Sequence, residues 1–369
     1  MVWEDGGGNP SSYPMRPPDA RSPEVRPGAG GRDSRVFSAT MLPFILRRLA
    51  QAVLVLLVVG MGAFSLFQYV GDPVSNMVGQ DATLAQRERL RGELGLDRPA
   101  PVQFARFVGH ALGGDFGVSL RQGREVSVLI AERLPATLEL SVVAAALALA
   151  LGIPLGVYAA LRRRHWDAKL TMAVSLLGVS LPTFLIGIAL IEIFSVLLGW
   201  FPSFGRGTTV QLGGWTSGLL TADGWRHIAL PALTLAVYQL ALVMRLVRAE
   251  MLEALRSDYV KFARARGLPD RVVHFGHALR NTLVPVLTIT GLQLGGLIAF
   301  SVITETVFAW PGMGSLFIQA VQFPDVPVMA AYLCLVALVF VVINLAVDLL
   351  YAVVDPRLRA HAVPGEGRR

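Results

Sequence analysis

Six long apolar runs without a charged residue constrain this chain more than any other feature of its sequence. At about 1.5 Å per helical residue, each run can cross a hydrocarbon layer about 30 Å thick. Hydrocarbon offers no hydrogen-bonding partner to the backbone, so such runs are expected as helices, which satisfy their own N–H and C=O groups. The sequence therefore predicts an all-α polytopic membrane protein of six spans, at residues 50–70, 140–161, 170–191, 228–244, 282–304 and 326–347.

The charge distribution predicts the orientation of these spans. Only 16% of residues are charged, and the net charge of +7 gathers in the segments after the second, fourth and sixth runs. Residues 305–327, on the opposite side, contain no Lys or Arg. The positive-inside rule then places both termini in the cytoplasm, so that the long loop at 71–139 faces outward. Attraction to anionic membrane lipids explains the basic segments, and no nucleic-acid partner is expected.

The segments outside the spans differ in kind. Residues 1–40 are rich in Pro, Gly, Ser and Arg and have no apolar periodicity, so they are expected to form a disordered cytoplasmic tail, with Met41 as a candidate native start. The outer loop at 71–139 contains two helical patterns, one opened by a capping box at Thr83 and Gln86 and one at 103–112. A small outer helical subdomain is expected there, and residues 360–369 form a second cytoplasmic tail.

The cytoplasmic loop at 249–281 is amphipathic rather than merely polar. Apolar side chains recur in it at helical spacing, at Leu252, Leu255, Tyr259 and Phe262. Gly267 can end a helix in the left-handed conformation, and Pro269 suits the first turn of the next. A pair of short helices joined at Gly267 is therefore predicted, with one apolar face available for packing or docking.

Chemical motifs are scarce. Neither lysine, Lys169 or Lys261, follows the glycine of a nucleotide-binding loop, and the single cysteine, Cys334, excludes a disulfide within the chain and favours a packing role. No metal, cofactor or catalytic site is expected. Glu192 and Asp348 are the acids nearest to membrane depth, and local pairing or an interfacial position is favoured for both over proton transfer.

Several sequence blocks resemble one known family along 41–359, the permease domain. The blocks are GELGLDRP (92–99), RLPATLELS (133–141), GIPLGV (152–157), SLPTFLIG (180–187), LPALTLA (230–236), DYVKFARARGL (258–268), HALRNTLVPVLT (277–288), ETVFAWPGMG (305–314) and VDLLYAVVDPRLR (347–359). In this order they resemble the B-type permease subunit of the dipeptide, oligopeptide and nickel branch of bacterial ABC importers. The resemblance implies a type I importer permease fold in the cell membrane.

The resemblance also implies partners and a coupling site. It implies a homologous C-type permease, two ABC ATPase subunits that bind the ATP and Mg, and an extracytoplasmic substrate-binding protein; this chain would be a transport subunit and not an enzyme. The family's EAA-type coupling sequence matches Lys261, Ala263, Arg264, Ala265, Gly267, Leu268 and Pro269, in the 258–285 loop. Lys261 stands where the general motif has Glu, and Phe262 where it has its first alanine, so contacts of an acidic side chain do not carry over.

A glycine motif in the fifth span suggests a subunit contact. Gly291 and Gly295 have the GxxxG spacing, followed by Gly296, and small residues of this kind let another helix approach closely. We expect these three glycines to face the partner permease.

Two rival classes of protein remain open: a secondary transporter, disfavoured by the charge-free span centres, and an intramembrane enzyme, disfavoured by the lack of a convergent catalytic cluster. The substrate class favoured is di- and oligopeptides, with nickel chelates, glutathione and oligosaccharides as alternatives.

Overall fold

The computed structural model describes residues 33–69, 83–93 and 97–354. Two compact units divide at Ile45 and Leu46, within the first helix, and all contacts below lie in the second unit, Leu46–Arg369. The elements in chain order are α1 (Asp33–Tyr69), α3 (Leu84–Glu93), α4 (Ala100–Leu112), α5 (Val126–Leu161), α6 (Trp166–Ser180), α7 (Thr183–Leu190), the π-helix η1 (Ile191–Leu197), β1 (Val210–Leu212), β2 (Trp215–Ser217), α8 (Ala222–Ala254), α9 (Asp258–Ala265), the π-helix η2 (Val272–Ala278), α10 (Leu279–Val307), α11 (Met313–Gln322) and α12 (Val326–Val354).

Five of the six predicted spans are continuous in the described part of the chain. They are Leu46–Leu66, Val126–Leu161, Ala222–Ala254, Val272–Val307 and Val326–Asp348, and each contains an apolar window long enough to cross a membrane. The third predicted span is broken instead, into Trp166–Ser180 and Thr183–Leu197, which are bent by 109°.

The break in the third span has a local cause at Pro182. Leu181 is extended, with φ −87° and ψ 138°, the conformation that a following proline imposes, and Pro182 opens α7. The prolines in the second, fourth and fifth predicted spans, Pro154, Pro231 and Pro285, lie inside continuous helices. Of these four prolines, only Pro182 coincides with a broken span.

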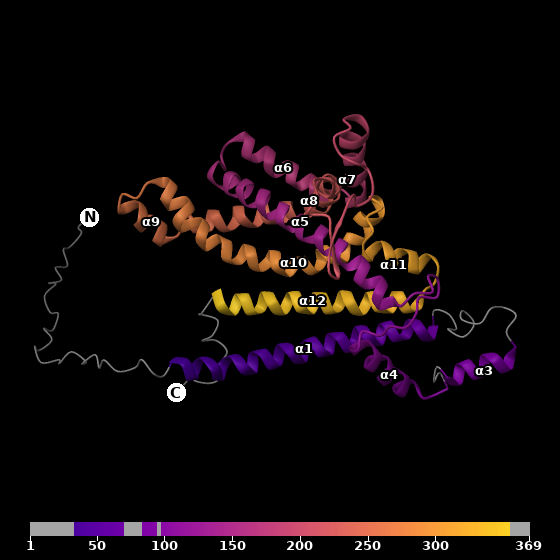
Figure 1. Cartoon of the computed structure of the whole chain (residues 1–369). Coiled ribbons are helices and arrows are strands. Elements are labelled where there is room, and N and C mark those ends of the chain that lie inside the picture. The colour runs from indigo at the N-terminus through magenta and orange to yellow at the C-terminus, as the bar shows by residue number, and fades with distance from the viewer. Residues whose placement is uncertain (1–32, 70–82, 94–96, 355–369) are drawn as a thin grey trace, which may run out of the picture. The chain divides into compact units, whose positions relative to one another are not determined.

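Helices α5 and α8 form the central pair of the bundle (Figure 1). Alanines from both helices pack face to face in a core that includes Ala144, Ala148, Ala232 and Ala236. Gly152 and Gly156 continue this seam: a Cβ at Gly156 would lie 2.7 Å from the Met244 carbonyl oxygen and from Val247 Cβ. A GxxxG pair that the sequence analysis passed over thus sets the close approach of α5 to α8.

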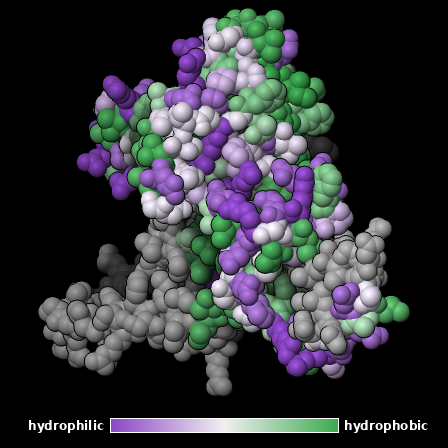
Figure 2. Space-filling view, turned by 45° about the vertical axis from the view of Figure 1, so that its right-hand side comes forward, coloured by the Kyte–Doolittle hydropathy of each residue, from purple (hydrophilic) through white to green (hydrophobic). Residues whose placement is uncertain are grey.

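The remaining helices pack around this pair. α10 lies against α8 on one side and α12 on the other, and α11 turns back between α10 and α12 (Figure 1). β1 and β2 form an antiparallel hairpin in which Val210 pairs with Ser217 and Leu212 with Trp215. α9 lies at the end of the α8–α10 pair away from α11 (Figure 1). In the space-filling view, which brings the α11 end forward, hydrophilic side chains gather across the middle of the visible face beside hydrophobic surface (Figure 2).

Outside the spans, the structure agrees in part with what the sequence predicts. Thr83 N–H donates to Gln86 Oε1 at 3.0 Å and Gln86 N–H to Thr83 Oγ1 at 3.4 Å, so the capping box forms and opens α3. α4 ends at Gly113, as expected. α1 begins at Asp33, before the boundary expected at residue 40, because residues 33–40 contain none of the glycines and prolines that precede them. Residues 1–32 and 360–369, the rest of the expected tails, lie outside the described residues.

Candidate coupling surface

The turn at Gly267 is built as the sequence predicted. α9 follows Ser257, whose backbone is extended, and ends at Arg266, and Gly267 has a φ of 78°. Its N–H donates to the Arg264 carbonyl at 2.9 Å, and the N–H of Leu268 reaches back to the Ala263 carbonyl at 3.3 Å. The left-handed residue lets the chain reverse immediately after the helix, a conformation that glycine adopts at little cost.

Pro269 starts the second helix of the pair. Its carbonyl oxygen accepts hydrogen bonds from Val272 N–H at 2.9 Å and Val273 N–H at 3.1 Å, so the chain turns into a helix directly after it. Leu268 and Pro269 are exposed. The two short helices predicted for this loop are therefore present and meet at Gly267, with η2 leading without interruption into α10.

The inner face of α9 is anchored in the bundle. Val260 is fully buried and Ala263 almost so. They pack in one core cluster with residues of α5, α8, η2 and α10, which are Val157, Ala160, Val243, Val247, Met251, Val273, Ala278 and Val286. The small side chain of Ala263 lets α9 lie close to this cluster, so α9 packs directly against the ends of α8 and α10.

The outer face of α9 exposes large side chains to solvent. Phe262 is 65% exposed and Tyr259 41%, and the Arg266 guanidinium lies 5.9 Å from the centre of the Phe262 ring. The single apolar face expected from Leu252, Leu255, Tyr259 and Phe262 is therefore divided, because α8 ends at Ala254 and a separate helix, α9, begins at Asp258. Leu252 and Leu255 pack against the core cluster, whereas Tyr259 and Phe262 face outward.

The charged residues of this turn pair with one another. Lys261 Nζ donates to Asp258 Oδ1 at 2.8 Å, a contact that lowers the pKa of the Asp258 carboxyl below its ordinary value. Arg264 lies 3.8 Å from Asp270, across the turn, and 3.5 Å from Nε2 of His274. Arg264 and Ala265, like Lys261, are exposed. Of the seven predicted coupling residues, only Ala263 is buried in the chain, and the others form the rim around the outer face of α9.

The glycines of the fifth span have a partner in their own chain. A Cβ at Gly291 would lie 2.5 Å from Val347, and one at Gly295 would overlap the ring of Phe340, both residues of α12. Gly291 and Gly295 are thus occupied by α12 of this chain, which corrects the expectation that they face a partner permease. Gly296 differs: it is partly exposed, and only its neighbour Gln293 comes near, at 3.7 Å.

Glu139 and Arg206, which no local sequence pattern predicted to meet, form a buried pair near the β hairpin. Arg206 Nη2 donates to Glu139 Oε2 at 2.7 Å, and the two side chains are only 7% and 5% exposed. Trp215 Nε1 and Gly218 N–H also donate to the Glu139 carboxylate, at 3.3 and 3.2 Å. Arg206 in turn donates to the Thr216 carbonyl at 2.6 Å. This pair fastens the 199–221 segment to α5.

A second buried acid, Glu305, lies at the end of α10. Thr137 Oγ1 and Ser301 Oγ donate to Glu305 Oε1 at 2.7 and 3.0 Å, and Ser315 N–H donates to Oε2 at 2.9 Å. Thr137 Oγ1 accepts from Met313 N–H at 2.8 Å, so its own proton points at the carboxylate. Glu305 therefore joins α5, α10 and the first turn of α11.

Asp325 makes the third such junction. Its carboxylate accepts from Ser119 Oγ at 2.5 Å and from the N–H groups of Leu120 and Arg121, which ties the segment before α5 to the turn between α11 and α12. Glu139 and Glu305 immediately flank charge-free runs, in the RLPATLELS and ETVFAWPGMG blocks. An acid directly beside a charge-free run was the available signal. Of the two acids singled out earlier, Asp348 pairs with Arg48 at 2.9 Å, as expected, and Glu192 is exposed on η1.

The described residues contain no group of three or more His, Cys, Asp or Glu side chains placed to hold a metal ion. What the arrangement offers is mechanical: a bundle of apolar helices with an anchored, outward-facing helix at one end and buried polar junctions at the other. The class that this fold defines is a multi-pass α-helical membrane protein.

Comparisons with known proteins give the family. The family described as binding-protein-dependent transport system inner membrane component matches residues 152–360, and the N-terminal part of the same component matches residues 41–141. The permease protein GsiC of the glutathione transport system is 39% identical in Salmonella paratyphi A and 38% in Escherichia coli K12, over 86% of this chain and 99% of each relative. Inward-facing structures of the MetNI methionine ABC transporter are 20% and 18% identical, cover 60% of this chain and 93% of theirs, and have TM-scores of 0.48 and 0.49.

This chain belongs to the family of binding-protein-dependent transport system inner membrane components. It is a permease subunit of an ATP-driven importer and a multi-pass protein of the bacterial inner membrane. It works with a substrate-binding protein and with ATPase subunits, to which the hydrolysis of ATP belongs. The resemblance drawn from the sequence blocks is thereby confirmed.

Proposed function

We propose that this chain pairs with a homologous C-type permease, with which it forms one translocation path, and that two ABC ATPase subunits dock at its α9 end. ATP and Mg are bound by the ATPases and not by this chain, and an extracytoplasmic binding protein delivers the substrate. The cargo is short peptides. This choice is supported by the relatives named as glutathione transport permeases, since glutathione is itself a tripeptide.

The observation that carries the coupling role is that α9 is buried on one face and exposed on the other. Val260 and Ala263 fix its inner face to the core, while Phe262 and Tyr259 present apolar surface to solvent beside exposed cations. Exposed aromatic side chains rimmed by charge are typical of protein-docking sites. A partner that holds this outer face moves α9 as a rigid body, and the core cluster passes the motion to α8 and α10.

Gly267→Val tests this role. At a φ of 78° a β-branched residue is strained by about 1–2 kcal/mol or more, although a Cβ there would meet no neighbour. We expect normal membrane abundance, weaker ATPase binding and little uptake, measured by co-purification and by transport of a labelled peptide. Gly267→Asn is the matched control, because Asn tolerates the left-handed region and should keep most of the activity.

The outcome that contradicts the coupling role is clear. If Gly267→Val transports normally and the reconstituted ATPase still responds to loaded binding protein, this turn does not transmit the motion. The cargo is tested separately, by competition of unlabelled dipeptides, glutathione and an oligosaccharide against uptake of labelled glutathione. Competition by the oligosaccharide alone would contradict the peptide assignment and leave the coupling role untouched.

A further inference from the structure

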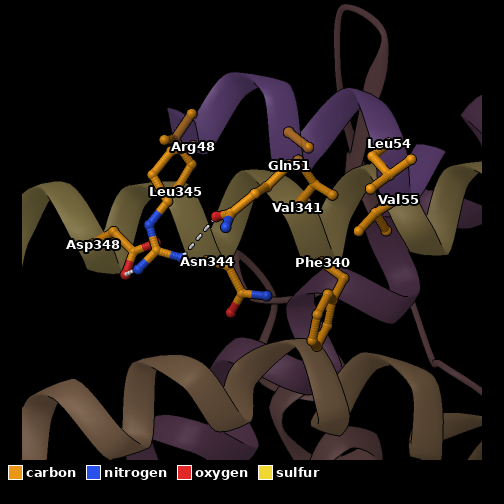
Figure 3. Close-up of a pocket in the computed structure, with 10 residues that line it drawn as sticks. Arg48, Gln51, Leu54, Val55, Phe340, Val341, Asn344, Leu345 and Asp348 are labelled. Atoms are coloured by element: carbon orange, nitrogen blue, oxygen red, sulfur yellow. Dashed lines mark hydrogen bonds and ion pairs between the residues drawn. The ribbon is translucent and has the colours of Figure 1, made fainter. Parts of the chain in front are cut away.

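A pocket lies between α1 and α12 (Figure 3). It encloses about 360 Å³, and its walls change character along their length. Arg48 and Asp348 stand at one end with Gln51 and Asn344, whereas Leu54, Val55, Phe340 and Val341 line the other (Figure 3). The two helices run in opposite directions here, so the polar residues of both meet at the same end.

The polar end lies at the membrane boundary. Arg48 precedes the first apolar run and Asp348 ends the last one, on the side that the charge distribution predicts to face the cytoplasm. From Arg48 to Val55 the helix advances about 10 Å into the apolar layer. The pocket therefore spans the depth at which a phospholipid changes from headgroup to acyl chain.

Two opposite charges lie together at this end. Arg48 Nη2 donates to Asp348 Oδ1 at 2.9 Å and Nη1 to Gln51 Oε1 at 3.5 Å. The Arg48 side chain remains 41% exposed and that of Asp348 19%, so the pocket reaches both charges. Asn344 of α12 also lines the pocket and adds a side-chain amide to its wall (Figure 3). A cation and an anion exposed side by side suit a ligand that also carries one charge of each sign.

We propose that this pocket binds a zwitterionic phospholipid with a primary ammonium headgroup, of the phosphatidylethanolamine class. The phosphodiester lies against Arg48 and the Asn344 amide, the ammonium donates to the Asp348 carboxylate, and an acyl chain follows Leu54, Val55 and Phe340. An anionic lipid without the ammonium would bring a second negative charge to Asp348. A choline headgroup has no N–H to donate, so it loses the contact with the carboxylate.

The test uses the transporter complex in nanodiscs containing phosphatidylethanolamine, phosphatidylcholine and phosphatidylglycerol with identical acyl chains. Native mass spectrometry reports the lipid retained by the complex. We expect phosphatidylethanolamine to be retained about tenfold more strongly than either other lipid, the effect of one charge-assisted hydrogen bond. Arg48→Gln and Asp348→Asn should each abolish the preference. Arg47→Gln is the matched control, because Arg47 is the adjacent, exposed arginine outside the pocket.

A second measurement separates lipid binding from a structural role of the ion pair. Phosphatidylethanolamine should raise the thermal unfolding midpoint of the wild-type complex and of Arg47→Gln more than phosphatidylcholine does, and this difference should vanish in the two pocket variants. A purely structural pair would lower the midpoint equally in every lipid, and that result overturns the proposal. Equal retention of phosphatidylglycerol, or no lipid retained by the wild type because a partner helix fills the pocket, overturns it as well.

Discussion

Glu139 and Arg206 show what a single residue contributes at the end of the bundle that carries the β hairpin. The pair is almost fully buried, and Glu139 also accepts from Trp215 and Gly218. Burying two charges is costly even when they are paired, so such a pair stabilises little relative to apolar residues of the same size. Its effect is positional: the contacts of Glu139 and Arg206 hold the 199–221 segment against α5.

A double-mutant cycle tests that view. Arg206→Met alone leaves the buried Glu139 carboxylate without its cationic partner and should lower the free energy of unfolding by about 3–5 kcal/mol. Combining it with Glu139→Gln removes the stranded charge while an amide oxygen still accepts from Trp215, so the double variant should be more stable than Arg206→Met. Thermal unfolding midpoints of the purified complex measure both. A double variant as unstable as the sum of the two single ones would show that the charges act independently.

Helix pairing by glycine recurs at the scale of the elements. Gly152 and Gly156 bring α5 against α8, and Gly291 and Gly295 bring α10 against α12. Both pairs have the GxxxG spacing, which identifies a face where a helix approaches closely but does not identify the helix. Here both faces are covered by the chain itself.

Gly295→Leu should therefore damage this chain rather than its assembly. A leucine side chain would collide with Phe340 and force α10 from α12, at a cost of about 1–3 kcal/mol. The expected result is a lower unfolding midpoint of the subunit even when its partners are absent. Gly296→Leu is the control, since Gly296 has space around it, and it should leave that midpoint unchanged. If Gly296→Leu instead prevents co-purification with the second permease, the contact with that subunit lies there.

At the scale of the whole molecule, the two ends of the bundle are specialised differently. One end carries the exposed face of α9, and the other carries the buried junctions at Glu139, Glu305 and Asp325. The charge distribution predicts the first end to be cytoplasmic and the second to face outward. This orientation suits a permease that meets ATPases on one side and a binding protein on the other.

Cysteine labelling tests the orientation. The native Cys334 lies partly buried within the last span, so introduced cysteines can be read against a low background. Asp97→Cys should react with an impermeant thiol reagent in spheroplasts, whereas Arg266→Cys should react only after the membrane is permeabilised. The reverse pattern would invert the topology and would move the proposed lipid pocket to the opposite leaflet.

How far the sequence predicts this structure depends on the range of the interaction. The spans, the capping box at Thr83 and the left-handed turn at Gly267 follow from local patterns, and all appear. The hydrogen bonds of Glu305 to Thr137 and of Glu139 to Arg206 join residues 168 and 67 positions apart, and no local pattern specifies such partners. A proline at position 182 permits a bend but does not predict one, because Pro154, Pro231 and Pro285 occupy similar apolar runs without breaking their helices.

The prolines within the central pair have a consequence for stiffness. Pro154 weakens α5 beside Gly152 and Gly156, where α8 is uninterrupted, and Pro231 weakens α8 within the core that α5 supports. The two prolines lie at different levels of the helix pair, so each proline is packed against an uninterrupted stretch of the other helix. With its 33 residues, α8 is about 50 Å long. A 10° tilt of α8 about its middle would displace each end by about 4 Å. That displacement is enough to move α9, which packs at one end, without any bending of α8 between its two ends.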